Sequence, residues 1–174
     1  KSKNRKWSIA WEASLQNQPI ISKRGLKDIS SVYPFNPIAA VALPILCNKY
    51  SQNDRTLLTF LASDAPHAFK AFLKRHDFPS DKIATLKIDQ LYDYFVESAG
   101  IALSSRPQYQ RWIEIQSRIS EAMDFDLDAI KVLKIIGVLN LISNTGTLKA
   151  SREIVSTCLI DFPDKKNLAY WDKI

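Results

Sequence analysis

The chain has 174 residues, of which 46% are hydrophobic, and it contains 4 glycines and 2 cysteines. A chain of this length can bury a sizeable core, and few glycines among apolar residues at helical spacing predict a mainly helical, all-α fold. The two cysteines lie among apolar residues, which excludes a disulfide-stabilised secreted domain and predicts packed thiols in a reducing, cytoplasmic compartment. The longest apolar run, Ile38 to Cys47, is much shorter than the ~20 residues of a membrane span.

The net charge of +6 comes from the N-terminal part of the chain. Residues 1–50 carry 8 basic and 2 acidic side chains, whereas the positive and negative charges of residues 51–174 are equal in number. Basic residues beside Trp7 and Trp11 could attract phosphate groups without sequence specificity. We expect instead a solvated, partly frayed basic segment, residues 1–32, with a short amphipathic helix from Trp7 to Leu15. No apolar region of a signal peptide follows it, and a first residue that is not methionine is expected of an excised segment.

The stretch from Tyr33 to Tyr50 predicts a capped, buried helix. Pro34 and Pro37 bias the residues before them away from the helical region. Asn36 therefore suits the N-cap position, with Pro37 as the first helical residue. Pro44 removes a backbone donor from the middle of this helix and predicts a kink.

A second apolar helix should follow, beginning at Ser51 or Asn53. Its apolar residues cover one broad face: Leu57, Leu58, Phe60 and Leu61. Arg55 lies in the first turn, where a cation opposes the helix dipole by about 0.3 to 1 kcal/mol. Because this arginine does not help the helix to form, we expect function at this turn. The alternative interpretation is an ion pair with Asp54 or Asp64.

A third helix is predicted after Ser63 or Asp64 as its cap, with Pro66 in the first turn and an end near His76. Its expected inward face has helical spacing: Ala65, Ala68, Phe69, Phe72 and Leu73. His67 and His76 lie at opposite ends of this helix, and neither has a cysteine or an acid at zinc-ligand spacing. We therefore expect no metal site.

The next segment, Ile83 to Ile88, should be extended or irregular. Asp89 can cap a helix from Gln90 to Ser98, which ends at Gly100. Two serines, 104 and 105, then indicate a linker. We therefore expect a first helical subdomain over residues 33–103, which the resemblance described below makes lid-like, and a second subdomain over residues 104–174.

The second subdomain should begin with a helix opened by Pro107. Glu114 and Arg118 face outward in this helix, and the residues expected inward are Tyr109, Trp112, Ile113, Ile119, Ala122 and Met123. Asp126 or Asp128 should cap the most hydrophobic helix of the chain, residues 129–142. We expect this helix to be nearly buried, with Leu133 and Ile136 in the core.

The last part of the chain predicts a short strand from Leu148 to Ala150, a helix capped by Ser151 that reaches Ile160, and a final helix from Pro163 through Trp171. Helix, strand, helix, turn and helix is the opening order of a winged helix-turn-helix. The two wing strands that should follow are missing, so the subdomain is winged-helix-like with at most a short strand.

Sequence signatures of common enzymes are absent from the chain. It has no GxxxxGK[ST], GxGxxG or GxSxG segment, so it encodes neither a phosphate-binding loop nor a nucleophile elbow. We therefore do not expect this segment to be an enzyme by itself.

Five motifs in order resemble the segment that follows the ATPase core in large bacterial P-loop ATPases of AAA/STAND type. The resemblance covers residues 31–151. The motifs are Tyr33-Pro34-Phe35-Asn36-Pro37, Leu43-Pro44, Gln52-Asn53-Asp54-Arg55-Thr56-Leu57 with Phe60-Leu61, Leu91-Tyr92-Asp93-Tyr94-Phe95, and Leu133-Lys134 through Ile136-Gly137 to Leu139-Asn140-Leu141-Ile142. The resemblance implies a helical lid followed by a winged helix, an upstream domain that completes the site for ATP and Mg²⁺, and possible homo-oligomers.

The resemblance also implies two nucleotide-sensing candidates, Arg55 and Asn36. Arg55 matches the arginine of the third motif and resembles a sensor arginine. In the first motif the family pattern has histidine where this chain has Asn36, and in related ATPases such a histidine can contact nucleotide phosphate.

Three functions from different classes are therefore open. The first is a non-catalytic lid and winged-helix module that couples nucleotide state to conformation or partner binding. The second is a DNA-binding winged helix, for which the last helix offers Lys165, Lys166 and Lys173 against two aspartates. The third is a protein-interaction or oligomerisation domain, which exposed tryptophan or tyrosine near either end of the chain would favour.

Overall fold

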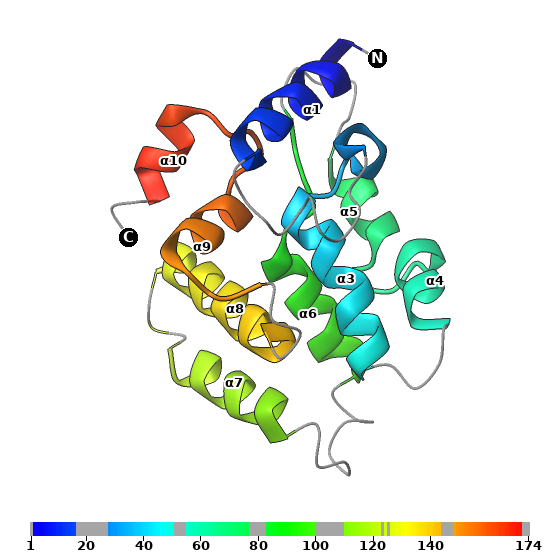
Figure 1. Cartoon of the computed structure of the whole chain (residues 1–174). Helices are drawn as coiled ribbons and strands as arrows, with labels where there is room; N and C mark the ends of the chain where they lie inside the picture. The colour runs from blue at the N-terminus through cyan, green and yellow to red at the C-terminus, as the bar shows by residue number, and fades with distance from the viewer. Residues whose placement is uncertain are drawn as a thin grey trace.

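The computed structural model describes residues 2–16, 28–50, 55–76, 83–99, 110–122, 124, 126–143 and 148–171. In these residues every regular element is a helix, which confirms the all-α fold class. The elements are α1 (Ser2–Leu15), the 3-10 helix η1 (Ile29–Val32), α3 (Pro37–Tyr50), α4 (Arg55–Ala62), α5 (Phe69–Arg75), α6 (Ile88–Ala99), α7 (Gln110–Glu121), α8 (Leu127–Ile142), α9 (Arg152–Leu159) and α10 (Lys165–Trp171) (Figure 1).

Helix α8 lies at the centre of the packing, against α3, α6, α7 and α9. Its N-cap is Asp126, whose side chain accepts hydrogen bonds from the backbone of residues 128 and 129. The expected core positions Leu133 and Ile136 pack against the core but are only partly buried, so they are not among its buried residues. The buried stripe runs instead through Ile135, Val138, Leu139 and Ile142, at helical spacing i, i+3, i+4 and i+7.

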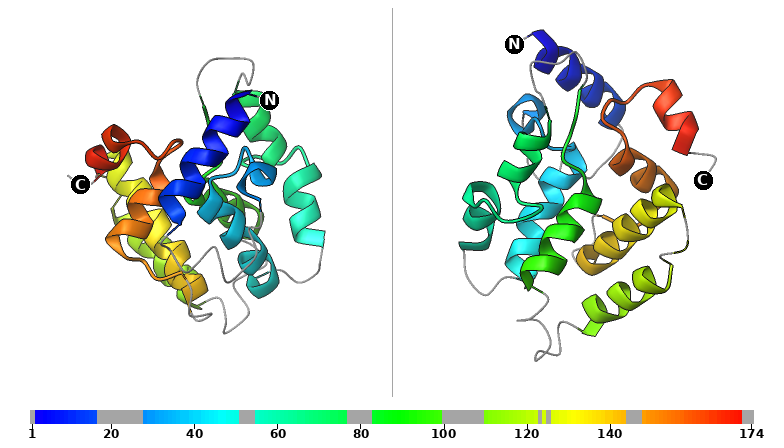
Figure 2. Two further views of the ribbon diagram at one scale, coloured as in Figure 1. Left: turned by 45° about the horizontal axis from the view of Figure 1, so that its top comes forward. Right: turned by 180° about the vertical axis from the view of Figure 1, so that it is seen from behind.

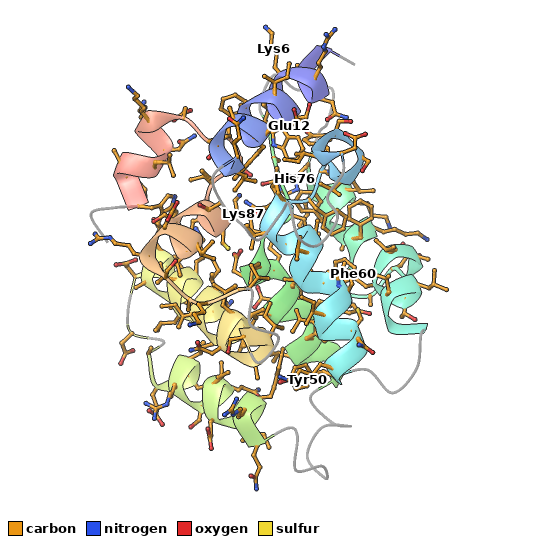
Figure 3. All side chains as sticks on the ribbon, viewed as in Figure 1. Lys6, Glu12, Tyr50, Phe60, His76 and Lys87 are labelled. Atoms are coloured by element: carbon orange, nitrogen blue, oxygen red, sulfur yellow. The ribbon has the colours of Figure 1, made fainter. Side chains whose placement is uncertain are left out.

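The described part of the N-terminal segment, residues 2–16 and 28–32, is not frayed. Helix α1 begins at Ser2, earlier than predicted, and Trp7 and Trp11 are fully buried. The Trp7 indole nitrogen also donates a hydrogen bond to the backbone oxygen of Asp161 at 3.0 Å. Two tryptophans one turn apart give α1 an apolar stripe, and tertiary packing of such a stripe stabilises a helix more than its local propensity does. Basic Lys6 on the same helix points into solvent (Figure 3).

One hydrophobic core contains side chains from each of the regions 1–32, 33–103 and 104–174. The expected boundary near residue 103 and the linker at serines 104 and 105 lie outside the described residues, as do Ser51, Asn53, Gly100, Pro107, Tyr109 and Met123. The division into subdomains stays a prediction.

The third predicted helix starts later than expected, at Phe69. Ala68 donates its backbone N–H to the Ala65 oxygen at 3.1 Å, and His67 between them has φ 59°. With Pro66 at the second position, this is the geometry of a type II turn, which replaces the expected first helical turn. Ala68 and Phe72 are buried, and Ala65 and Phe69 pack against the core, as predicted. Leu73 is 37% exposed, so its inward assignment is wrong. The end at His76 is confirmed.

Helix α6 begins at Ile88, so Asp89 is inside the first turn and is not the cap. The backbone N–H of Lys87 donates to the Gln90 side-chain oxygen at 2.9 Å, which is one half of a capping box. Trp112 and Ile119 of α7, and Ala122 directly after it, are buried as predicted. Ile113 is 48% exposed, so its inward assignment is wrong.

The strand expected from Leu148 to Ala150 is not formed. The Ser151 N–H donates to the Lys149 oxygen at 2.8 Å, so the chain turns tightly here and brings Ser151 to the N-cap of α9, as predicted. Helix α10 begins at Lys165 rather than at Pro163, because Asp164 accepts the backbone N–H of Asn167 and caps it. No support for a winged helix comes from these elements.

Candidate functional site

The turn before α3 is tied to a distant segment of the chain. The backbone N–H of Leu86 donates to the Pro34 oxygen at 2.7 Å, and the N–H of Asn36 donates to the Leu86 oxygen at 2.9 Å. These bonds form an isolated parallel bridge between Phe35 and Leu86. Residues 83–88, which were expected to be extended or irregular, therefore pair with the motif Tyr33-Pro34-Phe35-Asn36-Pro37.

Asn36 is fully buried, and its side chain caps two helices. Its Oδ1 accepts the backbone N–H of Ile38 at 2.9 Å, which confirms the predicted N-cap of α3. Its Nδ2 donates to the backbone oxygens of Thr157 at 2.9 Å and Ile160 at 3.2 Å, at the end of α9. An amide has two N–H donors, and both are used here. Contact between Asn36 and a nucleotide would require these hydrogen bonds to break.

Asp161 extends the same network, and sequence reasoning gave it no such role. Its Oδ1 accepts hydrogen bonds from the Thr85 backbone at 2.7 Å, from the Thr85 hydroxyl at 2.8 Å and from the Lys87 ammonium at 2.6 Å. Burial raises the pKa of Tyr33, and the nearby charge of Asp161 raises it further. The network joins α1, the turn before α3, the start of α6 and the end of α9, so it serves the fold.

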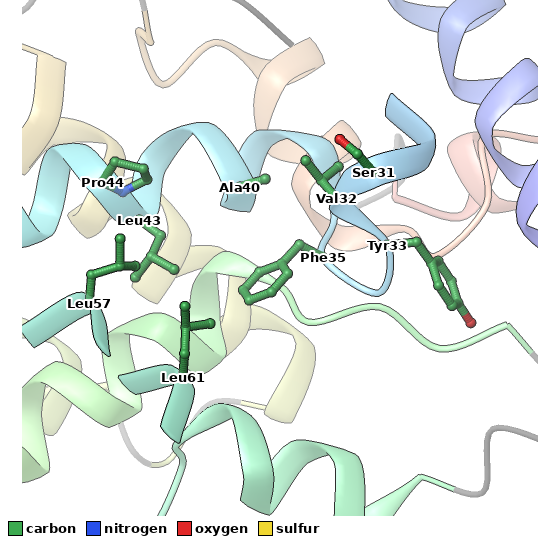
Figure 4. Close-up of a pocket in the computed structure, with 9 residues that line it drawn as sticks. All are labelled: Ser31, Val32, Tyr33, Phe35, Ala40, Leu43, Pro44, Leu57 and Leu61. Atoms are coloured by element: carbon green, nitrogen blue, oxygen red, sulfur yellow. The ribbon is translucent and has the colours of Figure 1, made fainter. Parts of the chain in front are cut away.

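An open apolar pocket of about 270 Å³ lies beside this network, between α3 and α4. Figure 4 shows Leu57 and Leu61 of α4 facing Leu43 and Pro44 of α3, with Phe35 on one side. The lining residues are Ser31, Val32, Tyr33, Phe35, Ala40, Leu43, Pro44, Leu57 and Leu61. Leu58, which follows Leu57 of the pocket wall in α4, is 65% exposed. This is an apolar surface on the helix that follows the predicted functional turn.

Arg55 is the first residue of α4, two residues before the pocket wall at Leu57. Its side chain and the acid Asp54 lie outside the described residues, while the other expected partner, Asp64, accepts from Lys74 at 2.9 Å. Asn36 precedes α3 and Arg55 follows it, and the 14 residues of α3 span about 21 Å. The two nucleotide-sensing candidates therefore lie near opposite ends of one helix.

The nucleic-acid candidates lie on the other side of the molecule, because α10 and α4 are at opposite edges in every view (Figure 2). Lys165 and Lys166 are exposed in the first turn of α10, next to the acidic cap Asp164. Lys173 lies outside the described residues. Two adjacent cations beside an acid make a weak basic surface for DNA.

Other reactive side chains are used for packing in the described part of the chain. Cys47 and Cys158 are both buried free thiols, as predicted. Burial raises the pKa of Cys47 to about 11, and burial and then the Asp89 charge raise that of Cys158. Within the described residues, no group of histidine, cysteine and acidic side chains has the arrangement of a metal site. Every helix in this part is too short or too polar to cross a membrane.

Comparison with protein-family models, with curated proteins and with solved structures found no match to this chain. The resemblance to AAA/STAND ATPases, and the roles that it implies for Arg55 and Asn36, stay predictions.

Proposed function

We propose that this chain is a non-catalytic helical module of a larger ATP-binding protein, and that it docks an apolar side chain of the upstream ATPase domain in the pocket between α3 and α4. The observation that carries the proposal is this open apolar pocket, together with the exposed Leu58 on the helix that forms one of its walls. Exposed apolar surface around an open depression marks a candidate site of protein–protein interaction.

The size and lining of the pocket favour a side chain over a nucleotide. Pockets for small-molecule ligands usually measure about 300 to 1,000 Å³, and this one, at about 270 Å³, lies at the lower end of that range. None of the described residues that line it is charged, and phosphate groups are held by cations or by clusters of backbone N–H groups. One bulky apolar side chain of a partner would match both the volume and the uncharged lining of the pocket.

Helix α4 supports a link between docking and nucleotide state. It is 8 residues long and begins with Arg55, and Leu57 and Leu61 on the same helix form one wall of the pocket. A contact between Arg55 and nucleotide phosphate would move α4, and a shift of α4 would change the width of the pocket. Such a rigid-body coupling could report the bound nucleotide to a neighbouring domain.

The resemblance supplies the rest of the proposal. ATP and Mg²⁺ are expected in the upstream P-loop domain, with cytoplasmic location and possible homo-oligomers. The isolated chain should neither hydrolyse ATP nor bind it tightly, because a lid contributes only one or two of the groups that hold the phosphates. ATP turnover by the purified chain that persists through further purification would overturn the module assignment.

Docking is tested with Leu58→Glu in the protein that joins this chain to its ATPase domain. Leu58 is mostly exposed, so the substitution should leave the melting temperature of the isolated chain unchanged within error. In the joined protein it should loosen the contact, which limited proteolysis and ATPase rate would detect. Thr59→Glu is the matched control, because Thr59 is the adjacent exposed residue of α4. Equal behaviour of both variants in the joined protein would refute docking at this pocket.

A further inference from the structure

The interface between α6 and α8 contains one ion pair, and one turn away it contains an acid and a lysine that are not paired with each other. Lys134 of α8 contacts Asp93 of α6, with 2.7 Å between Nζ and Oδ1. One turn earlier, α6 carries Asp89 and α8 carries Lys131. Residues four apart and three apart lie on the same helix face, so these two side chains are placed to form the next pair.

Asp89 has no such partner in this structure. Its Oδ1 is buried and accepts no hydrogen bond from the described residues. The charged and titratable groups that face it are Lys87 and Asp93 from its own segment, Lys131 from α8 and Cys158 from α9. A buried carboxylate with an unsatisfied oxygen is costly when it is ionised. Burial therefore raises the pKa of Asp89.

Lys131 is paired elsewhere, and that pair holds α10. Its Nζ lies 2.8 Å from Oδ1 of Asp128, on its own helix. The other oxygen of Asp128 accepts the Tyr170 hydroxyl of α10 at 2.7 Å. Helix α10 has no fully buried residue, and Leu168 and Trp171 pack only partly against the core. The Tyr170 hydrogen bond is therefore one of the contacts that hold α10 in place, and it joins this helix to α8.

We propose that Lys131 is shared between two acids, Asp128 and Asp89, and that its position sets how firmly α10 is docked. When Lys131 pairs with Asp128, as here, the ammonium orients that carboxylate so that its second oxygen meets Tyr170. When Lys131 turns to Asp89, Asp128 loses this orientation and α10 loosens, so Leu168 and Trp171 leave the edge of the core. This device is independent of the pocket between α3 and α4.

The direction of the pH response follows from the burial of Asp89. Protonated Asp89 has no charge to attract Lys131, so α10 is docked. As pH rises through the raised pKa of Asp89, the buried carboxylate attracts Lys131 away from Asp128. Docking of α10 should therefore weaken with rising pH. Because the Lys131–Asp128 pair is partly exposed, the protection of α10 amides against hydrogen exchange should fall only about two- to fivefold.

The experiment follows α10 by NMR between about pH 4 and 8, using the indole resonance of Trp171 and the protection factors of the α10 amides. In the unchanged chain both should show one transition. Asp89→Asn should remove this transition and leave α10 docked throughout, since asparagine stays neutral. Lys131→Gln should also remove it, because the shared cation is gone.

Two further variants separate the proposal from general loosening. Lys134→Gln breaks the neighbouring ion pair and should leave the α10 transition in place. Tyr170→Phe should loosen α10 at every pH. A transition that persists in Asp89→Asn or in Lys131→Gln would overturn the proposal, and so would an α10 that loosens as pH falls.

Discussion

The turn before α3 and helix α4 belong to one stretch of sequence, but they are held very differently. At the turn, Asn36 is fully buried, and its side chain makes hydrogen bonds to α3 and to the end of α9. Among the described residues of helix α4, only Phe60 is completely buried, and Leu58 on the same helix is 65% exposed. A polar residue whose hydrogen bonds are all used within the protein serves the fold, whereas a loosely held helix can respond to a partner. This difference separates the two nucleotide-sensing candidates.

The largest expected effect is at the turn. Asn36→Ala removes a helix cap and both donors to the backbone oxygens of Thr157 and Ile160, which remain buried. Each buried group left unsatisfied costs about 1 to 3 kcal/mol, so the free energy of unfolding should fall by roughly 4 to 5 kcal/mol. Chemical denaturation followed by circular dichroism measures this change.

The control for Asn36→Ala is Asn48→Ala, an exposed position near the other end of α3. We expect it to change the free energy of unfolding by less than ~0.5 kcal/mol. If Asn36→Ala were equally mild, the network around the turn would not stabilise the fold, and Asn36 would regain its place as a ligand candidate.

The next effect tests how α4 is attached. Phe60 is the buried anchor of this helix, and its ring lies 4.8 Å from that of Tyr94 and 6.3 Å from that of Phe35. Phe60→Ala should cost about 3 kcal/mol through lost burial and the cavity left behind. Leu58→Ala, two residues away, should change stability by less than ~0.5 kcal/mol. Thermal melts of the two variants compare them directly, and equal losses would mean that α4 is not held by one anchor.

A smaller effect is expected where α7 meets α8. A Cβ atom added at Gly137 would lie 2.5 Å from Cγ2 of Ile115, a methyl group on a β-branched and therefore stiff side chain. Alanine favours a helix over glycine by about 1 kcal/mol, but the overpacking costs about 1 to 3 kcal/mol. Gly137→Ala should therefore destabilise the chain by about 1 kcal/mol on balance. An increase in melting temperature would show that α7 can move away from α8 without loss.

Local signals in the sequence predicted much of the fold. The caps Asn36, Asp126 and Ser151 each act within a few residues. Asn36 and Ser151 are the predicted caps, and Asp126 is one of the two alternatives predicted for α8. The missed features depend on distant partners. The second role of Asn36 involves residues more than a hundred positions away, and Asp161 receives its donors from residues 85 and 87. Sequence spacing does not encode such contacts.

The candidate site also combines a local feature that the sequence predicts with a feature that depends on distant partners. The prediction of function at the turn before α4 rested on Arg55 as a cation that opposes the helix dipole, a local signal. The apolar pocket beside it requires α3, α4 and the turn at Tyr33 to pack together, so no spacing rule could have predicted it. Similarly, buried Trp7 and Trp11 were assigned to a solvated end because their partners are far along the chain.

The smallest effect on stability is expected at Arg55. It begins α4, where its charge opposes the helix dipole, so Arg55→Ala should change the melting temperature of the isolated chain very little, by the equivalent of less than ~0.5 kcal/mol. In a protein that includes the proposed ATPase domain, the same change should lower the ATPase rate at least about tenfold, because an arginine can stabilise charge on the transferred phosphate. Arg55→Lys is the matched variant, since it keeps the charge but loses the planar, two-pronged donor geometry, and it should recover only part of the rate. If Arg55→Ala instead destabilised the isolated chain while the ATPase rate stayed unchanged, Arg55 would be a structural ion-pair partner. Helix α4 would then link no nucleotide to the pocket, although docking at the pocket could still stand on the Leu58 result.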